Sequence, residues 1–180
     1  MAKEALLIVD MSNDFVADDG TLTVGKAGQE IVPYIKDLAT KFLAEGNIVV
    51  VSMDAHQPND PHFDLWPAHN VVNTEGQKLY GELNDWFQEN KDNENVIYDP
   101  KTNYNAFFKT GLAEKLRKEG VEKVHTVGVA TDICVFSTVS GADAEGFKTV
   151  THKRGVATFT NLGESMLNHM KRCFHTEVIE

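Results

Sequence analysis

The stretch Ala5-Leu6-Leu7-Ile8-Val9 is an unbroken apolar run that stops at Asp10. A second run, Ile48-Val49-Val50-Val51, repeats the pattern and leads to Asp54. Continuous apolar runs rich in β-branched residues, in place of alternating apolar and polar residues, are typical of strands that are buried on both faces. Such strands occur in parallel sheets that are covered by helices on both sides.

Segments with helical periodicity separate the apolar runs. In residues 29–45 apolar side chains recur with a spacing near 3.6 residues, until Gly46 ends the expected helix. The other expected helices are 81–88, 112–118, 134–145 and 163–173. The other expected strands are 95–98, 124–129, 148–151 and 177–179. The alternation predicts an α/β fold, a three-layer sandwich with helices on both faces of a mostly parallel six-stranded sheet. The length of 180 residues predicts a single domain, 1–180, with a loop elaboration at about 53–76.

The composition narrows the class of protein. Lys and Arg total 17 and Asp and Glu total 27, so the net charge is −10 with neutral histidines. This acidic balance disfavours binding to nucleic acid or to an anionic membrane surface. The chain has no apolar run near the ~20 residues of a membrane span and no signal-peptide cleavage pattern. Two cysteines cannot form a disulfide framework, so we expect a cytoplasmic protein.

Chemically active side chains follow the ends of the expected strands, where parallel sheets bind their ligands. Asp10 follows the first strand, Lys101 the third, and Cys134 the turn after the fourth. Taken singly, these residues have structural explanations, as a helix cap, a surface lysine and a core thiol. Together they favour nucleophilic catalysis. Cys134 opens a helix whose dipole favours the thiolate, Lys101 would lower the thiol pKa further, and Asp10 could take the proton.

A second group of candidate residues lies in the Pro/His/Asp-rich loop after the second strand. Asp54 and His56 are two residues apart, so in an extended segment their side chains face the same side and can bind one ion. His62 and His69 follow within thirteen residues of His56. Imidazoles with one carboxylate suit zinc, iron or manganese better than calcium or magnesium. The residues that compete with His62 for the remaining ligand position are the carboxylates of the same loop, Asp60 and Asp64.

Three segments carry a resemblance to a known family. The chain resembles nicotinamidases, also called pyrazinamidases. The segment that resembles their base motif is Asp10-Met11-Ser12-Asn13-Asp14-Phe15, and the one that resembles their lysine motif is Lys101-Thr102-Asn103-Tyr104-Asn105-Ala106-Phe107. The turn from Gly128 to Val135 resembles their nucleophile motif. These enzymes belong to the isochorismatase-like cysteine hydrolase superfamily. The resemblance runs from Leu7 to Val178 and implies an isochorismatase-like, Rossmann-like fold.

The resemblance assigns roles to the first group of candidates. It makes Asp10 the catalytic base, Lys101 the catalytic lysine and Cys134 the nucleophile. The nucleophile turn of the family holds a non-proline cis peptide bond, which would fall at Val129–Ala130 in this chain. The backbone N–H groups of Ala130 and Cys134 would then form the oxyanion hole.

The resemblance also covers the second group. Asp54-Ala55-His56 and Trp66-Pro67-Ala68-His69 resemble the metal motifs of family members that hydrolyse nicotinamide. The implied cofactor is one divalent metal ion, zinc by preference, with iron or manganese as alternatives. The third histidine ligand is His62 on its spacing from His56, with Asp64 as the rival.

Aromatic residues match the positions that hold the substrate ring in the family: Phe15, Trp66 and Tyr104. Ser12 stands where many members carry Gln, which leaves open what supports Asp10. The residues that match no catalytic motif, and are assigned to the surface or to packing, are His125, His152, His169, His175 and Cys173.

The implied activity is deamidation of nicotinamide to nicotinate and ammonia through a thioester, a step of NAD salvage, with pyrazinamide as a further substrate. By analogy with the family we also expect a homo-oligomer. One alternative is another carboxamide or ureide hydrolase of the same superfamily, and a remoter one is a non-enzymatic metal-binding or redox-thiol protein. Metal content and ammonia release would distinguish these three.

Overall fold

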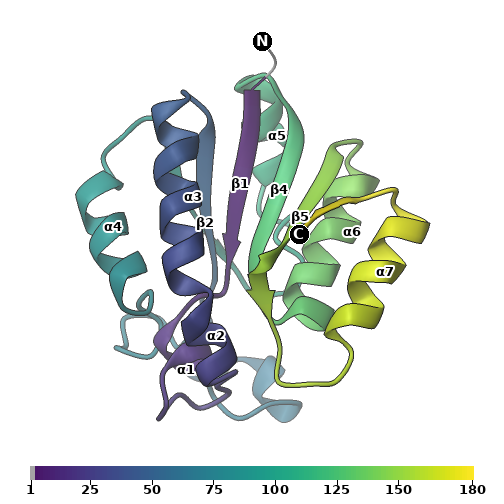
Figure 1. The fold of residues 1–180 in the computed structure, drawn as a ribbon. Coiled ribbons are helices and arrows are strands. Elements are labelled where there is room, and N and C mark those ends of the chain that lie inside the picture. The colour runs from purple at the N-terminus through teal and green to yellow at the C-terminus, as the bar shows by residue number, and fades with distance from the viewer. Residues whose placement is uncertain (1–2) are drawn as a thin grey trace.

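One sheet organises the molecule. In the computed structural model, which describes residues 3–180, six strands lie side by side in the order β3-β2-β1-β4-β5-β6 (Figure 1). Every pair of neighbours is parallel, which confirms the predicted α/β class. The strands are β1 (Lys3–Val9), β2 (Ile48–Asp54), β3 (Val96–Lys101), β4 (Val121–Val129), β5 (Lys148–Ala157) and β6 (Glu177–Ile179).

Helices cover both faces of this sheet, as Figure 1 shows, with α3 and α4 on one side and α5 and α6 on the other. The first side comprises α1 (Asn13–Val16), α2 (Lys26–Glu30), α3 (Val32–Ala44) and α4 (Glu82–Asn90). The second side comprises α5 (Leu112–Lys118), α6 (Phe136–Ala144) and α7 (Gly163–Cys173). Two short segments complete the chain, the 3-10 helix η1 (Pro61–Asp64) and the π-helical turn η2 (Thr131–Val135).

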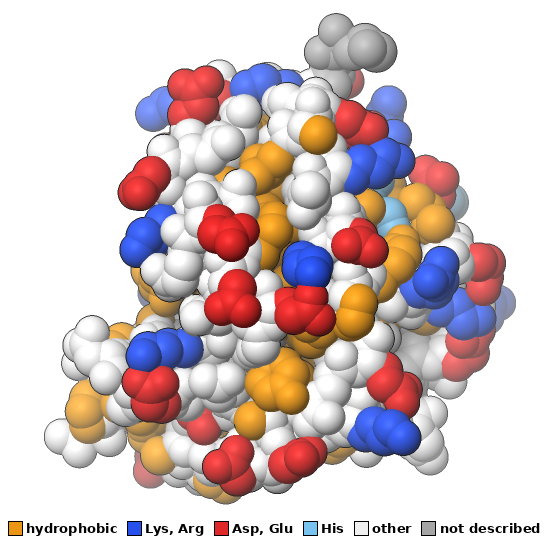
Figure 2. Space-filling model, turned by 60° about the vertical axis from the view of Figure 1, so that its left-hand side comes forward, with side chains coloured by type: hydrophobic (Ala, Val, Ile, Leu, Met, Phe, Trp, Pro, Cys, Tyr) orange, Lys and Arg blue, Asp and Glu red, His pale blue; other side chains and the backbone are white. Residues whose placement is uncertain are grey.

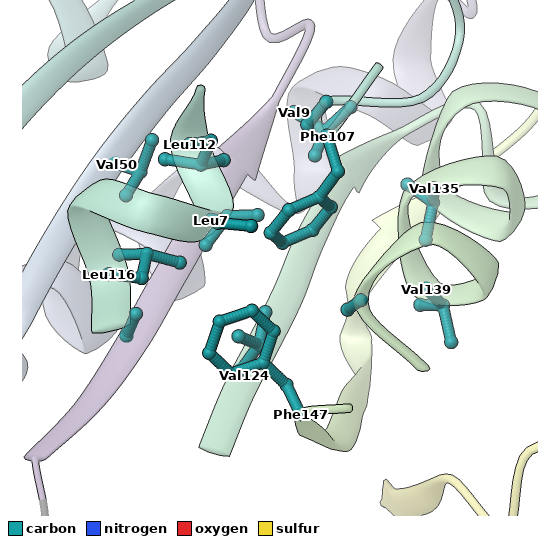
Figure 3. Packing of buried hydrophobic residues seen from close by; sticks show 14 of the residues in the cluster. Leu7, Val9, Val50, Phe107, Leu112, Leu116, Val124, Val135, Val139 and Phe147 are labelled. Carbon is teal, nitrogen blue, oxygen red and sulfur yellow. The ribbon is translucent and has the colours of Figure 1, made fainter. Parts of the chain in front are cut away.

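The apolar run of β1 serves two cores at once. Leu7 and Val9 point toward α5 and α6, and Phe107 and Phe147 pack in the same core on this face of the sheet (Figure 3). Leu6 and Ile8 point the other way, into the core beneath α3. Successive side chains of a strand face opposite sides, so a strand between two helical layers must be apolar at every position. This requirement explains the unbroken run.

The structure corrects several expected boundaries. The expected helix 29–45 is two helices, because α2 ends and α3 begins at Ile31, with a proline in the first turn of α3. Strands β2 and β3 continue through Asp54 and Lys101, which pair directly, so Lys101 is the last residue of β3 and does not follow it. Likewise β5 extends to Ala157 in place of 151. Backbone pairing does not require apolar side chains, so the apolar pattern ended too early.

The surface mixes both signs of charge. Figure 2, which brings the α4 side forward, shows basic side chains next to acidic ones, with apolar side chains exposed between them. Lys36 of α3 and Glu82 of α4 form one such ion pair across two helices. Within residues 3–180, no helix combines the length and the apolar character needed to cross a membrane.

A chain of polar side chains is buried between α3 and the sheet. Nδ1 of His125 on β4 lies 2.8 Å from Nε2 of His152 on β5. Nε2 of His125 lies 2.9 Å from Glu4 Oε2, and Nδ1 of His152 lies 2.9 Å from the hydroxyl of Tyr34. One proton on each imidazole satisfies the whole chain, with Tyr34 donating to His152, His152 to His125 and His125 to Glu4. His125 and His152 are therefore both held in their neutral form. Of the histidines that match no catalytic motif, only His169 and His175 are exposed in the described structure, whereas His125 and His152 are buried.

Burial, and then the charge of His125, lower the pKa of His152 from 6.5 to about 4. Burial lowers the pKa of His125 as well, although Glu4 opposes that shift. Other charged groups face these hydrogen-bonded side chains from α3, β4, β5 and β6. They are, in that order, Lys41, Lys123, Arg154 and Glu177. A second proton on His125 would place its Nδ1–H against the Nε2–H of His152, and a second proton on His152 would displace the hydrogen bond that Tyr34 donates to Nδ1. The native state therefore resists protonation.

We expect the free energy of unfolding to fall by about 2 kcal/mol between pH 7 and pH 5 through His152. The unfolded chain binds the proton near pH 6.5 and the native chain only near pH 4, so this stability is complete above pH 6.5 and is lost as the pH falls. His152→Gln should remove this part of the slope, whereas His169→Gln, at an exposed histidine, should retain it. Urea unfolding at several pH values measures both, and an unchanged slope in His152→Gln would contradict the prediction.

Candidate active site

Four buried side chains meet at the carboxyl end of the sheet. Asp10 directly follows β1, Asp54 ends β2, Lys101 ends β3, and Cys134 lies in η2 after β4. Each is at most 5% exposed. Because the strands are parallel and adjacent in the order β3-β2-β1-β4, their ends bring together residues that are far apart in sequence.

The ammonium of Lys101 is shared between two carboxylates. Its Nζ lies 2.7 Å from Asp10 Oδ2 and is also hydrogen-bonded to Asp54 Oδ1. The backbone N–H of Asp54 donates to Asp10 Oδ1 at 2.8 Å, so both oxygens of Asp10 are engaged. A buried lysine is stable only when its charge is paired and hydrogen-bonded. The two carboxylates meet that requirement and fix the position of Lys101.

The pKa shifts follow from this arrangement. Burial, reinforced by the charge of Asp54, raises the pKa of Asp10 to about 6, although Lys101 opposes the shift. Burial would lower the pKa of Lys101, but the charges of Asp10 and Asp54 outweigh it and raise that pKa above 10.5. Burial would raise the pKa of Asp54, but Lys101 holds it well below 3.8. Asp54 is therefore the firmly ionised carboxylate of the pair, and Asp10 has the greater proton affinity.

The thiol of Cys134 lies next to these groups. Its Sγ and one carboxylate oxygen each from Asp10 and Asp54 lie within 4.8 Å of one another. Burial, followed by the charge of Asp10, raises the pKa of the thiol well above 9.0, and Lys101 offsets only part of this. Lys101 lowers the thiol pKa as expected, but burial outweighs this effect and the net shift is upward. The resting thiol holds its proton beside Asp10, which can accept it.

The turn that carries Cys134 requires a glycine. Gly128 has φ = +117°, and a Cβ at this position would lie 2.0 Å from the carbonyl oxygen of Val9. The close approach brings the end of β4 against the end of β1 and hence Cys134 toward Asp10. The cis peptide bond that the resemblance predicts is confirmed at Val129–Ala130. Cys134 does not open the helix as expected, because the π-helical turn η2 precedes α6.

Three histidines converge beside Asp54. One ring nitrogen from each of His56, His62 and His69 lies within 4.8 Å of the other two. Asp54 Oδ2 is 3.5 Å from Nε2 of His56 and 3.7 Å from Nε2 of His69. Donor atoms around a tetrahedral zinc ion lie roughly 3.3–3.5 Å apart, so this spacing suits a small divalent ion.

Hydrogen bonds orient two of these rings. Nδ1 of His56 donates to Asp60 Oδ2 at 2.9 Å, and Nδ1 of His69 donates to the carbonyl of Pro67 at 2.7 Å. Both Nε2 atoms therefore keep a free lone pair that points into the cluster. Among the described residues, Nε2 of His56 has no hydrogen-bond partner although it is buried. An unpartnered buried nitrogen beside a carboxylate is what a metal ligand without its ion looks like, so the residues fit the implied metal.

The two rival carboxylates of the loop have other roles. Asp60 caps the start of η1, and its Oδ1 accepts the backbone N–H of His62 at 2.8 Å while its Oδ2 orients His56. Asp64 is exposed, and His62 is the residue that completes the histidine cluster. The sequence Asp60-Pro61 is a helix-start signal that could have identified the capping role of Asp60.

Ser12 supports the loop that carries the histidine cluster rather than Asp10. Its hydroxyl donates to Asn70 Oδ1 at 2.7 Å, and Asn70 Nδ2 donates to the carbonyl of Asp54 at 3.4 Å. The carbonyl of Asn70 accepts the backbone N–H of His56 at 3.0 Å. Asn70 is fully buried with φ = +44°. Its hydrogen bonds join the segment that carries Asp54 and His56 to the segment that carries His69. Sequence reasoning missed Asn70, because a lone asparagine in a polar loop gives no signal.

A pocket opens above Cys134. All three predicted aromatic residues line it, and Nε1 of Trp66 donates to the hydroxyl of Tyr104 at 2.9 Å. Asp54, His62 and His69 border the same pocket, so a ligand in it contacts the histidine cluster and the thiol together. The lining residues that sequence reasoning missed are Leu22, Val24, Val129, Ile133 and Phe159. Their apolar character made them indistinguishable from core residues.

Comparison with known proteins identifies the family. The isochorismatase domain model matches residues 4–179, so the chain belongs to the isochorismatase family. An uncharacterized isochorismatase family protein, PncA of Bacillus subtilis (strain 168), is 41% identical over 182 residues, which cover 99% of this chain and 100% of that protein.

Solved structures agree with this assignment. The crystal structure of a nicotinamidase/pyrazinamidase PncA from Bacillus subtilis superposes with a TM-score of 0.96 at 39% identity and covers 99% of this chain and 100% of that one. The pyrazinamidase of Pyrococcus horikoshii, solved in complex with zinc, superposes with a TM-score of 0.87 at 30% identity and covers 99% of each chain.

A matched pair of variants tests the histidine cluster. Asp60→Asn leaves one carbonyl oxygen where two oxygens orient His56 and cap η1, and we expect it to weaken zinc binding by roughly 10–100-fold. Asp64→Asn, at an exposed carboxylate four residues away, should leave the affinity unchanged. Competition of the metal-free protein against a chromophoric chelator measures both. Asp64→Asn weakening zinc binding more than Asp60→Asn would assign the ligand position to Asp64.

Proposed function

We propose that this protein is a metal-containing cysteine amidohydrolase that deamidates nicotinamide to nicotinate and ammonia, and that it also accepts pyrazinamide. The observation that supports this most directly is the Cys134 thiol beside the Asp10 carboxylate, at the base of an aromatic pocket bordered by a histidine cluster. The Bacillus subtilis structure named as a nicotinamidase/pyrazinamidase supports the choice of substrate. The reaction would return nicotinamide to NAD synthesis.

Binding comes first in the proposed mechanism. The pyridine ring lies among the aromatic residues of the pocket, which exclude water from one face of the scissile bond. A divalent ion held by Asp54, His56, His62 and His69, zinc by preference, would supply an open coordination position for the pyridine nitrogen. The carboxamide then faces Cys134.

Acylation uses the buried groups in sequence. Asp10 takes the thiol proton, and the sulfur of Cys134 attacks the carboxamide carbon. The backbone N–H groups of Ala130 and Cys134 donate to the oxyanion. The positive charge of Lys101 stabilises the negative charge that develops on the reacting groups next to Asp10. Asp10 then returns the proton to the leaving nitrogen as the C–N bond breaks. Ammonia departs and a thioester remains.

Deacylation regenerates the enzyme. A water molecule takes the place of ammonia and attacks the thioester carbon while Asp10 accepts its proton. The C–S bond breaks, Asp10 returns the proton to sulfur, and the acid leaves as nicotinate after its carboxyl proton passes to solvent. A carboxylate of raised proton affinity is suited to this alternation, because it must both accept and release the same proton.

Replacement of the nucleophile tests this mechanism. Cys134→Ala should reduce ammonia release from nicotinamide by roughly 10³-fold or more, because both the acyl acceptor and its proton are lost. Cys173→Ala, at an exposed thiol on α7, should retain the wild-type rate. A coupled ammonia assay with nicotinamide and pyrazinamide measures both variants.

The same assay separates the alternatives. Wild-type activity in Cys134→Ala would exclude the proposed nucleophile. Hydrolysis of ureides without hydrolysis of nicotinamide would favour another amidohydrolase of the family. Absence of ammonia from every amide and ureide, together with reversible oxidation of Cys134, would favour a redox-thiol protein.

A further inference from the structure

The loop between β5 and α7 places an aromatic side chain at the mouth of the pocket. Phe159 lines the same pocket as Cys134 and yet is 53% exposed. Neither of the two core clusters of the described residues includes it. Half-exposing a phenylalanine forgoes much of its apolar burial, so packing does not explain why the ring is held at this position.

Hydrogen bonds fix the loop on both sides of this residue. The hydroxyl of Thr158 donates to Asp132 Oδ1 at 2.5 Å, and the hydroxyl of Thr160 donates to Asp132 Oδ2 at 2.7 Å. The loop is also closed internally, because the N–H of Thr160 donates to Thr158 Oγ1 at 3.3 Å and that of Leu162 to Thr160 Oγ1 at 3.0 Å. Phe159 therefore has an anchored residue on either side.

The anchor belongs to the turn that carries the nucleophile. Asp132 lies in η2, two residues before Cys134, and both of its carboxylate oxygens are engaged by the loop. Any movement of η2 would carry Phe159 with it, so the ring keeps its place relative to the thiol. The strand order puts this loop on the β5 side of Cys134, opposite the histidine cluster on the β2 side.

We propose that Phe159 is a specificity-determining residue that narrows the entrance to Cys134 and limits the size of the group that reaches the thiol. Asp132 is its positioning residue. Single-ring primary carboxamides fit beneath this side chain, whereas fused two-ring carboxamides meet it. The choice of carboxamides rests on the proposed function, but the restriction of access to the thiol does not.

Alkylation of Cys134 tests access without relying on any enzymatic activity. In a Cys173→Ser background only Cys134 can react, and its rate is measured with iodoacetamide as the small reagent and N-phenylmaleimide as the bulky one. Phe159→Ala should raise the ratio of the bulky to the small rate by roughly tenfold. Leu162→Ala is the matched control, since Leu162 is exposed on the same loop and is not a pocket residue.

One further variant and one substrate pair complete the test. Thr160→Val keeps the shape of the side chain but removes one hydrogen bond to Asp132, so it should raise the ratio by a smaller factor than Phe159→Ala. An unchanged ratio in Phe159→Ala, or an equal rise in Leu162→Ala, overturns the proposal. An unchanged ratio in Thr160→Val overturns the role of Asp132. Near-ultraviolet circular dichroism checks that each variant is folded.

Substrate choice then links the narrowing of the entrance by Phe159, called the gate below, to the reaction. Phe159→Ala should raise kcat/KM for quinoline-3-carboxamide relative to nicotinamide, by roughly the same tenfold factor. A wild-type protein that leaves nicotinamide intact, while Phe159→Ala still changes the alkylation ratio, would refute the proposed function and retain the gate. The opposite pattern, hydrolysis of nicotinamide with both ratios unchanged, would refute the gate alone.

Discussion

The buried ammonium of Lys101 is the constraint on which the site depends. A charge at the end of a sheet, without contact with solvent, is tolerated only because Asp10 and Asp54 both accept its hydrogen bonds. Each of the three residues stands at the end of a different strand, and these strands are neighbours in the order β3-β2-β1. The register of the parallel sheet therefore determines the electrostatics of the site, since a shift of one residue in any of these strands would leave a buried charge unpaired.

Asp54 joins the two chemical halves of the site. One of its oxygens binds Lys101, while the other faces Nε2 of His56 and of His69. Its low pKa keeps it negative, which suits a ligand of a divalent ion as well as a partner of a buried ammonium. A change at Asp54 would consequently disturb both the histidine cluster and the group that supports Asp10. The two constellations that the sequence presents separately are thus coupled through one carboxylate.

The fold was largely predictable because it depends on apolar patterning, which local sequence records directly. The runs at 5–9 and 48–51 predict buried parallel strands, and the structure confirms them. The patterning failed where pairing continues through polar residues, as at Asp54 and Lys101. The geometry of the candidate site was predictable where a motif fixes it, including the cis bond at Val129–Ala130.

Features that arise only from three-dimensional contact escaped sequence reasoning. Asn70 and the Asp132 anchor act through hydrogen bonds between segments far apart in the chain, and no spacing rule predicts them. The high pKa of the Cys134 thiol escaped for the same reason, because burial is a property of the whole fold and outweighs the effect of Lys101.

The strand order separates what must be rigid from what can vary. Asp10, Asp54 and Lys101 are held by the sheet itself, and Gly128 brings the turn that carries Cys134 against β1 with no room for a side chain. The histidine loop after β2 and the Phe159 loop after β5 instead approach Cys134 from opposite sides. Because loops tolerate substitution better than strand ends, the two loops can vary the lining of the pocket while Cys134 and Asp10 stay in place. A substitution in either loop can therefore reshape the pocket without moving Cys134, Asp10 or Lys101.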